Sequence, residues 1–283
     1  DIDLKEYKKY LEEINYIVNE GPEFKITTSN VDKEISTICG PQLVVPITNA
    51  RFALNAVNAR WGSFYDALYG TDALGDMPKG NNYDSERGVR VVAFAKSHLD
   101  KFAPLLNASW SEINKIQLLE NKIVLSSANN SNINLENNNQ IIGWRKNQKS
   151  ILTELILLKN NLHCRILINA NDAIGKNDPA NIADILIESA ISTILDCEDS
   201  VATVDADDKI LAYRNWLGLV KGDLQAEFKK NNQVVTRTLN KDIKFCTNKG
   251  SEEFLKTRSL MLIRNVGHLM TTPAILNKDN QEI

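Results

Sequence analysis

The chain lacks the features that mark several large classes of protein. None of its apolar runs reaches about 18 residues, so we expect no transmembrane helix. Basic residues are not in excess: 33 Lys and Arg stand against 36 Asp and Glu, and a net charge of −3 argues against a dedicated nucleic-acid binder. Residues 1–12 are charged and helical in pattern, which is not the pattern of a signal peptide.

Cysteine and histidine are scarce, with four and three residues respectively among 283. The cysteines lie far apart and include no CxxC pair, so we expect no zinc site and infer reduced thiols in a cytoplasmic protein. The motifs GxGxxG, Walker A, HExxH and GxSxG are also absent. Their absence removes the commonest sequence evidence for nucleotide-binding and hydrolase sites.

What the sequence does contain is a unit that occurs more than once, an apolar strand followed by a polar loop and an amphipathic helix. Residues 43–47 predict a strand that is buried on both faces, and residues 192–196 and 259–263 each predict a further buried strand. The first is followed by apolar positions at helical spacing over residues 54–68, and the second by a helix that Asp205 caps. This order is typical of a parallel α/β sheet or barrel.

Polar, strand-rich segments interrupt this repeated unit twice. Residues 89–94, 121–126 and 141–144 predict strands with one solvated face, whereas residues 179–190 predict a helix. Residues 128–140 are rich in asparagine and predict a solvent-exposed hairpin tip or loop. The interruptions indicate an α/β domain inserted into the barrel or sheet.

Polar residues gather where the three predicted buried strands end. Functional residues of parallel α/β proteins lie at the carboxyl ends of strands, so these positions are the candidate site. In chain order they are Asn49, Arg51, Asp196, Glu198, Asp199, Ser200, Arg264 and Asn265, with Arg60 as a further candidate after the first strand.

Two alternatives stay open at these strand ends. Glu198 and Asp199 suit the neighbourhood of a divalent cation, or they cap the following helix and favour its positive end. Arg264 suits an anion or an oxyanion, or it forms a structural ion pair with the acidic cluster. For His268, which follows the third strand, we expect a structural role.

Four segments lie around these strand ends: PQLVVPITNARFALNAVNARWGSFYDALYGTDAL (41–74), DCEDSVATVDADDKILAYRNWLGLVKGDL (196–224), RTLNKD (237–242) and RSLMLIRNVGHLMTTPAIL (258–276). These segments resemble the G isoform of the malate synthase family. The region 75–180 is far more divergent, which suits an inserted domain.

The resemblance implies an α/β fold in which a partial TIM (β/α)8 barrel is interrupted by an inserted α/β domain. Residues 1–40 would be the end of an N-terminal helical clasp and its linker. The barrel would supply a first strand and helix at 41–75, a second strand and helix at 191–221, and a third strand with the start of the next segment at 258–283. The inserted domain would comprise residues 76–190 and 222–257.

The family condenses acetyl-CoA with glyoxylate, in a Claisen condensation, and hydrolyses the thioester to give malate and CoA in the glyoxylate cycle. The resemblance implies that acetyl-CoA is bound by Val44, Arg51, Phe52, Ser200 and Arg237. Arg264 matches the catalytic arginine that contacts glyoxylate and stabilises the enolate, a role that suits a permanently charged, planar guanidinium.

The family also uses Mg²⁺, which polarises the glyoxylate aldehyde as a Lewis acid. Asp196, Glu198 and Asp199 match acidic residues at the barrel mouth, and we expect Asp196 and Glu198 to act around the waters of the metal. The direct ligands and the catalytic base, an aspartate, lie downstream of the arginine in the family and have no matching position before Ile283. We therefore expect no direct metal ligand in this chain.

The same departure predicts that the 283 residues are inactive alone. For the full-length enzyme we expect a monomer, and the composition predicts a cytoplasmic protein with no nucleic-acid or membrane partner. Two alternatives remain: a stable, non-catalytic fragment or binding module, and a related barrel lyase that acts on acyl-CoA esters.

Overall fold

The computed structural model describes residues 3–25, 27–80, 82–230, 233–266, 271, 273 and 276–282. The chain forms two compact units, residues 1–32 and residues 33–283, which we describe separately. In the first unit, α1 (Leu4–Glu13) begins after Asp3, whose carboxylate accepts a hydrogen bond from the Lys5 amide. None of the residues of α1 is buried.

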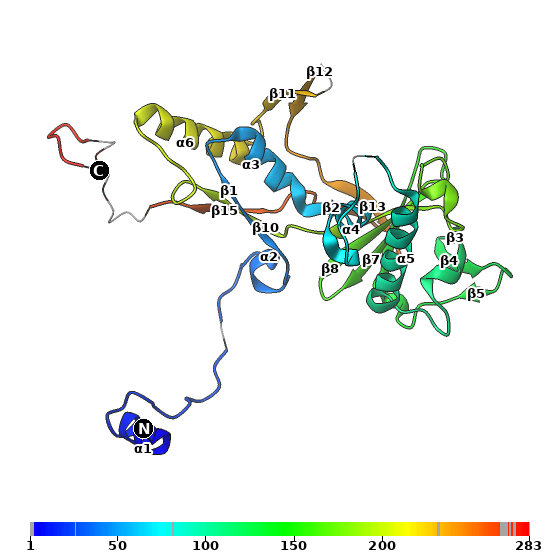
Figure 1. Ribbon diagram of the computed structural model, residues 1–283, viewed down its shortest axis with the longest axis horizontal. Coiled ribbons are helices and arrows are strands. Elements are labelled where there is room, and N and C mark those ends of the chain that lie inside the picture. The colour runs from blue at the N-terminus through cyan, green and yellow to red at the C-terminus, as the bar shows by residue number, and fades with distance from the viewer. Residues whose placement is uncertain are drawn as a thin grey trace. The chain divides into compact units, whose positions relative to one another are not determined.

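In the second unit, the three predicted strands form one parallel sheet. They are β1 (Gln42–Pro46), β10 (Ser192–Asp196) and β15 (Leu260–Arg264), in the order β1–β10–β15 (Figure 1). The register aligns Pro46, Asp196 and Arg264 across the carboxyl edge. The prediction of a strand at each of these positions is therefore confirmed.

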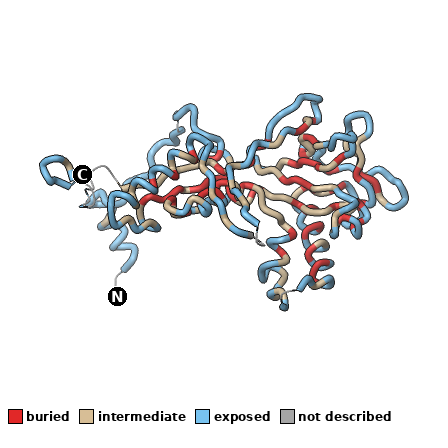
Figure 2. The backbone as a smooth tube through the Cα atoms, turned by 90° about the horizontal axis from the view of Figure 1, so that it is seen from above, coloured by how far each residue is buried: buried red, intermediate tan, exposed pale blue. Residues whose placement is uncertain are grey.

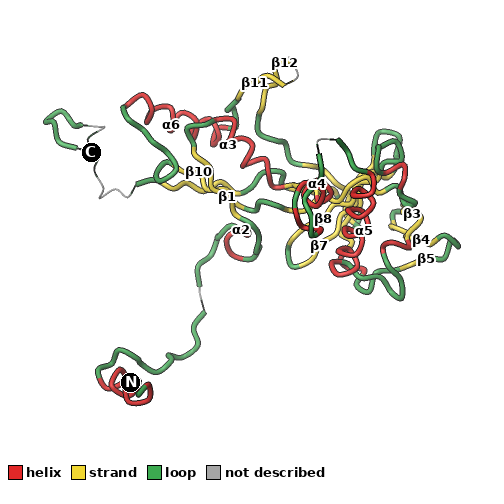
Figure 3. The backbone as a smooth tube through the Cα atoms, viewed as in Figure 1, coloured by secondary structure: helices red, strands yellow, loops and turns green. Residues whose placement is uncertain are grey.

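Two helices cover one face of this sheet, α3 (Ala50–Val57) and α6 (Ala206–Lys221) (Figure 3). Asn49 caps α3, and Asp205 caps α6 as the sequence predicts. The shared core contains Val45, Ala53, Leu54, Val57, Leu195, Ala212 and Leu219. The prediction that β1 is buried on both faces is wrong, because Val44 on the opposite face is 54% exposed.

The predicted helix over residues 54–68 is interrupted. After α3, the 3₁₀ turn Asn58–Arg60 leads into β2 (Trp61–Ser63), and α4 (Phe64–Gly70) follows. Ser63 ends the strand and caps α4, since its hydroxyl accepts a hydrogen bond from the Asp66 amide at 2.9 Å. Antiparallel pairing of β2 with a distant strand therefore overrides a helical apolar period.

That distant strand belongs to a seven-stranded antiparallel sheet with the order β14–β13–β6–β7–β8–β9–β2. Its other members are β6 (Ile141–Lys146), β7 (Leu152–Lys159), β8 (Leu162–Ile168), β9 (Ile182–Glu188), β13 (Ile243–Thr247) and β14 (Glu252–Leu255). Buried residues concentrate in strands and helices, and exposed residues in the connecting loops (Figure 2).

The long helix α5 (Ser85–Phe102) and a small sheet complete this part of the chain. The small sheet contains β3 (Ile113–Leu119), β4 (Lys122–Ser127) and β5 (Asn132–Ile133). Shorter elements are α2 (Lys33–Ser36) and the 3₁₀ turns Asp72–Leu74, Trp110–Glu112, Asn138–Gln140 and Gly175–Asn177. No helix in the described part of the chain has the length and apolarity needed to cross a membrane.

Two predictions of local structure are wrong, and two are confirmed. Residues 89–94, which were predicted to form a strand, lie in α5, where Val91, Ala95 and Leu99 form a buried stripe at helical spacing. Residues 179–190 were predicted to form a helix, but residues 182–188 form the strand β9, which pairs with β8 on one side and β2 on the other. The strands predicted over 121–126 and 141–144 correspond to β4 and β6.

The segment 128–140 differs in part from the predicted exposed loop. Its asparagines are exposed as predicted, but Leu135 and Gln140 are buried.

The segment 222–257 contributes strands to two different sheets. The hairpin of β11 (Ala226–Lys230) and β12 (Gln233–Arg237) contacts α3, whereas β13 and β14 extend the seven-stranded sheet.

Candidate functional site

Arg264 and Asp196 end neighbouring parallel strands, and the register of those strands pairs them directly. The guanidinium donates from Nε to Asp196 Oδ1 at 2.8 Å and from Nη2 to Oδ2 at 2.7 Å. Such a two-bond fork fixes the orientation of the guanidinium as well as its position. The Asp196 side chain is fully buried, while 39% of the Arg264 side chain remains exposed. The buried carboxylate therefore holds the guanidinium in place, while part of the Arg264 side chain stays accessible to solvent.

The loop that follows β10 folds around the Asp196 carboxylate. The backbone amides of Glu198 and Ser200 donate to it at 3.0 Å and 2.8 Å, and the Ser200 hydroxyl donates at 2.6 Å. The bonds from Arg264, with these loop donors, hold the pKa of Asp196 well below its usual range. The same carboxylate raises the pKa of Arg264, so both groups are charged at neutral pH.

Glu198 and Asp199 do not share the buried position of the Asp196 side chain. Asp199 Oδ2 lies 3.3 Å from Nη1 of Arg264, and its side chain is 74% exposed. The capping residue of α6 is Asp205, so neither of these acids caps that helix. Of the open alternatives for Arg264, the structure contains the ion pair, and the exposed part of the guanidinium leaves room for an anion.

The described residues do not form a complete ligand set for a divalent cation. They include no group of three or more His, Cys, Asp or Glu side chains placed to hold a metal. Both oxygens of Asp196 already accept hydrogen bonds from Arg264, Ser200 and the Glu198 amide. The expected place of Asp196 and Glu198 around metal-bound water stays a prediction.

A second group of predicted residues meets at the hairpin β11–β12. The Arg51 guanidinium on α3 lies over the ring of Phe228, 4.1 Å from its centre, and the Arg237 guanidinium on β12 lies 5.8 Å from the same centre. Nε of Arg237 is buried and has no hydrogen-bond partner among the described residues. Phe228 was missed by sequence reasoning; the alternation of 226–230 and 233–237 around two asparagines was the available hairpin signal.

The remaining predicted residues are Val44, Phe52, Asn265 and His268. Val44 is on the open face of β1, and Phe52, in the first turn of α3, is 51% exposed. Asn265 donates to the Tyr213 hydroxyl at 3.0 Å. His268 lies outside the described residues.

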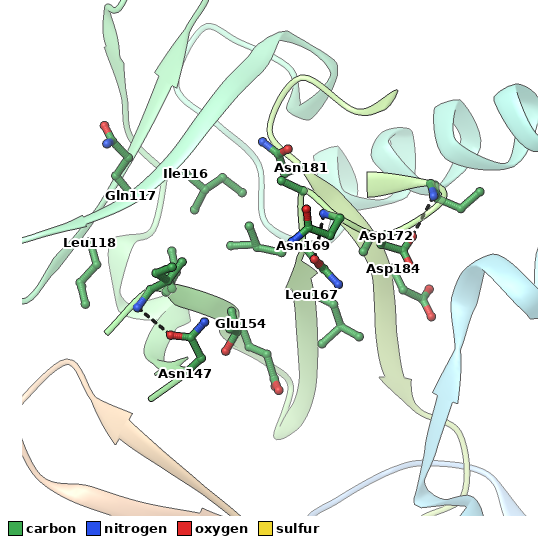
Figure 4. Close-up of a pocket in the computed structure, with 18 of the residues that line it drawn as sticks. Ile116, Gln117, Leu118, Asn147, Glu154, Leu167, Asn169, Asp172, Asn181 and Asp184 are labelled. Atoms are coloured by element: carbon green, nitrogen blue, oxygen red, sulfur yellow. Dashed lines mark hydrogen bonds between the residues drawn. The ribbon is translucent and has the colours of Figure 1, made fainter. Parts of the chain in front are cut away.

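A cavity of about 1030 Å³ lies elsewhere, beside the seven-stranded sheet (Figure 4). Its lining includes Asn147, Asn169 and Asp184, and burial raises the pKa of Asp184. Glu154 also lines it and forms ion pairs with Arg145 and Arg165. None of the residues predicted for the site is among the described residues that line this cavity.

Comparison with known proteins finds similarity along the whole chain. Residues 83–160 match the family model described as malate synthase G, alpha-beta insertion domain. The chain is 44% identical over 285 residues to malate synthase G of Halalkalibacterium halodurans, covering 100% of this chain and 39% of that protein. It is 46% identical over 286 residues to malate synthase G of Corynebacterium glutamicum, covering 100% of this chain and 38% of that protein.

Malate synthase G of Corynebacterium efficiens is 45% identical over 284 residues, with 99% of this chain and 38% of that protein covered. The predicted resemblance to malate synthase G is therefore confirmed. The chain spans 38–39% of the length of these curated relatives. The insertion-domain match at 83–160 falls within the segment 76–190 that sequence reasoning assigned to the insert.

Proposed function

We propose that this chain is part of a malate synthase, which joins acetyl-CoA to glyoxylate and releases CoA. The observation that carries the proposal is the anchored Arg264 at the carboxyl edge of a parallel sheet, in a chain 44–46% identical to malate synthase G. In the reaction, the acetyl methyl group loses a proton and the resulting enolate carbon attacks the aldehyde carbon of glyoxylate. Water then cleaves the thioester to give malate and CoA.

Arg264 has the properties that the charge-bearing steps need. Negative charge develops on the thioester oxygen as the enolate forms, and a fixed cation stabilises that charge without having to reorient. The bidentate bond to Asp196 fixes the cation, and the exposed part of the guanidinium faces away from the buried carboxylate. Asp196 acts through Arg264 and is a positioning residue in this proposal, as is Ser200.

Acetyl-CoA combines an anionic, phosphate-bearing portion with an acyl thioester. Arg51 and Arg237, which lie beside Phe228, suit the anionic portion. Guanidinium groups bind phosphate through charge-assisted hydrogen bonds, which is the role we propose for Arg51 and Arg237. Val44 and Phe52 are apolar side chains that are 54% and 51% exposed, and we propose that they contact the apolar portion of the ligand.

We also propose that β1, β10 and β15, with α3 and α6 on one face, are strands and helices of a partial TIM barrel. The inserted domain would comprise 76–190 together with the part of 222–257 that holds β13 and β14. The Mg²⁺ ion that the resemblance implies has no complete ligand set among the described residues, so we derive no step through it.

Release of CoA from acetyl-CoA and glyoxylate tests the proposal. The complete gene product containing these residues should turn over, whereas the 283 residues alone should not. Arg264→Lys keeps the charge but loses the planar fork, and should lower kcat by about 100-fold or more. Arg214→Lys, at an exposed position on α6, is the matched control.

Four outcomes count against these statements. No turnover by the complete gene product contradicts the malate synthase assignment. Turnover by the 283 residues alone contradicts their inactivity. A fully active Arg264→Lys protein contradicts the role of the guanidinium fork, while turnover with other acyl-CoA esters but not with glyoxylate favours the lyase alternative.

A further inference from the structure

Phe228 is the residue on which two predicted ligand-binding arginines converge. The guanidinium carbons of Arg51 and Arg237 lie 4.1 Å and 5.8 Å from the centre of its ring. The face of an aromatic ring carries partial negative charge and attracts a cation within about 6 Å. One ring therefore attracts two like-charged groups that would otherwise repel each other.

The hairpin register explains how this arrangement arises. In the antiparallel pair, Phe228 is opposite Val235, and Arg237 is opposite Ala226. Phe228 and Arg237 are thus diagonal neighbours on one face of the hairpin. Ala226 packs against the core beneath α3, which brings this face towards Arg51 in the first turn of that helix.

Apart from the Phe228 ring, Arg51 and Arg237 have few polar contacts among the described residues that would fix their positions. Among the described residues, neither side chain forms a hydrogen bond or an ion pair, and Nε of Arg237 is buried without a partner. A buried donor that lacks a partner is costly, and a bound acceptor would remove that cost. Two neighbouring guanidinium groups without a carboxylate partner suit a ligand that carries several negative charges, such as a chain of phosphates.

We infer that Phe228 is a positioning residue that holds Arg51 and Arg237 at the spacing needed to clamp the phosphate groups of acetyl-CoA. This inference rests on the proposed function and adds to it the residue that orders its substrate-binding cations. Phe228 acts through the two arginines. Its loss should therefore weaken binding of acetyl-CoA and leave the handling of glyoxylate at the Arg264 site unchanged.

The test compares Phe228→Leu, which removes the aromatic face, with Phe228→Tyr, which keeps it. In the complete gene product, Phe228→Leu should raise the KM for acetyl-CoA and the Kd for CoA by about three- to tenfold. The salt dependence of CoA binding should become shallower, because the cations are less well ordered. Phe228→Tyr should keep the wild-type affinity and the wild-type salt dependence. In both variants, kcat and the KM for glyoxylate should stay at wild-type values.

Val234→Ala is the matched control, since Val234 lies on the opposite face of the same hairpin and is 64% exposed. It should leave all of these constants unchanged. Wild-type affinity for CoA in Phe228→Leu would overturn the inference and leave the proposed function standing, as would an equal rise in the KM for glyoxylate. A wild-type protein that neither binds CoA nor turns over would instead overturn the proposed function, and the inference with it.

Discussion

At the scale of single residues, the Asp196 carboxylate organises the candidate site. It is fully buried, yet each of its oxygens accepts hydrogen bonds from Arg264 and from the loop of residues 198–200. A buried carboxylate is stable as an anion only with such compensation. The acidic residue that sequence reasoning placed beside a metal is therefore the anchor of the arginine.

Asp196→Asn should destabilise the protein in a pH-dependent way. The pKa of Asp196 is lowered in the folded protein, so its contribution to stability is fully present above the unfolded-state value of about 4. That contribution is lost as the pH falls through the lowered folded pKa. Urea unfolding at neutral pH should therefore show a loss of about 2 kcal/mol in Asp196→Asn, and the difference from wild type should shrink below about pH 4.

Asp199→Asn provides the comparison for this prediction. Asp199 approaches the same guanidinium at 3.3 Å, but its side chain is 74% exposed. Exposed ion pairs contribute about 0–1 kcal/mol, so this variant should unfold close to wild type at either pH. An Asp196→Asn protein whose deficit is the same at neutral and acid pH would contradict the assignment of the stabilisation to the charged carboxylate.

At the scale of elements, local pattern predicted the parallel strands and their helices more successfully than the insert. The strands ending at Pro46, Asp196 and Arg264 have short apolar runs, and the caps Asn49 and Asp205 act on their own neighbours. Residues 61–63 instead form a strand because they pair with residues 186–188, which lie 123–127 positions away in the sequence. No local window contains that information.

Gly143 shows how closely two strands of the seven-stranded sheet approach each other. It lies in β6, opposite Thr247 of β13, and a Cβ at this position would overlap the carbonyl oxygen of Cys246 and lie 2.8 Å from the Phe245 ring. Gly143→Ala should therefore push β13 away from β6 and lower the free energy of unfolding by about 1–3 kcal/mol. Urea unfolding measures the loss, and hydrogen exchange of the β13 amides locates it.

Gly70→Ala is the control for this substitution, because a Cβ at Gly70 would meet nothing within 4 Å. At the end of α4 it should leave stability unchanged or raise it slightly, since alanine favours helix more than glycine does. Unchanged stability and unchanged exchange at β13 in Gly143→Ala would show that the two strands accommodate the added Cβ without separating, and would contradict the prediction.

At the scale of the whole molecule, one buried arginine joins segments that are far apart in sequence. Arg60 donates from Nη1 to Glu34 at 2.9 Å and from Nε to Glu188 at 2.8 Å, and it also donates to the carbonyl of Arg258. The side chains of the two glutamates are 2% and 1% exposed. Burial opposes ionisation of Glu34, but hydrogen bonds from Lys256 and Arg60 outweigh it and lower the pKa to about 2.

Arg60→Met should be strongly destabilising, because it leaves two buried carboxylates short of their cation. Breaking a buried ion pair from one side costs about 3–5 kcal/mol, and thermal or urea unfolding should show a loss of that order. Lys256→Met removes a different partner of the same Glu34 oxygen, but the Lys256 side chain is 58% exposed. Its loss should cost about 1 kcal/mol or less, and equal losses in the two variants would contradict the central role of Arg60.

The sequence by itself determined which residues end the parallel strands, that a helix follows each of the first two, and which family the chain resembles. These are local properties: apolar runs, capping side chains and continuous matched segments. The tertiary structure alone decided that Asp196 anchors Arg264, that the Arg51 and Arg237 guanidinium groups lie beside the Phe228 ring, and that β2, β13 and β14 join β6–β9 in the seven-stranded sheet. Each of these depends on strand register and on contacts between distant segments, because a side chain's partner is set by where the backbone places it and not by its neighbours in sequence.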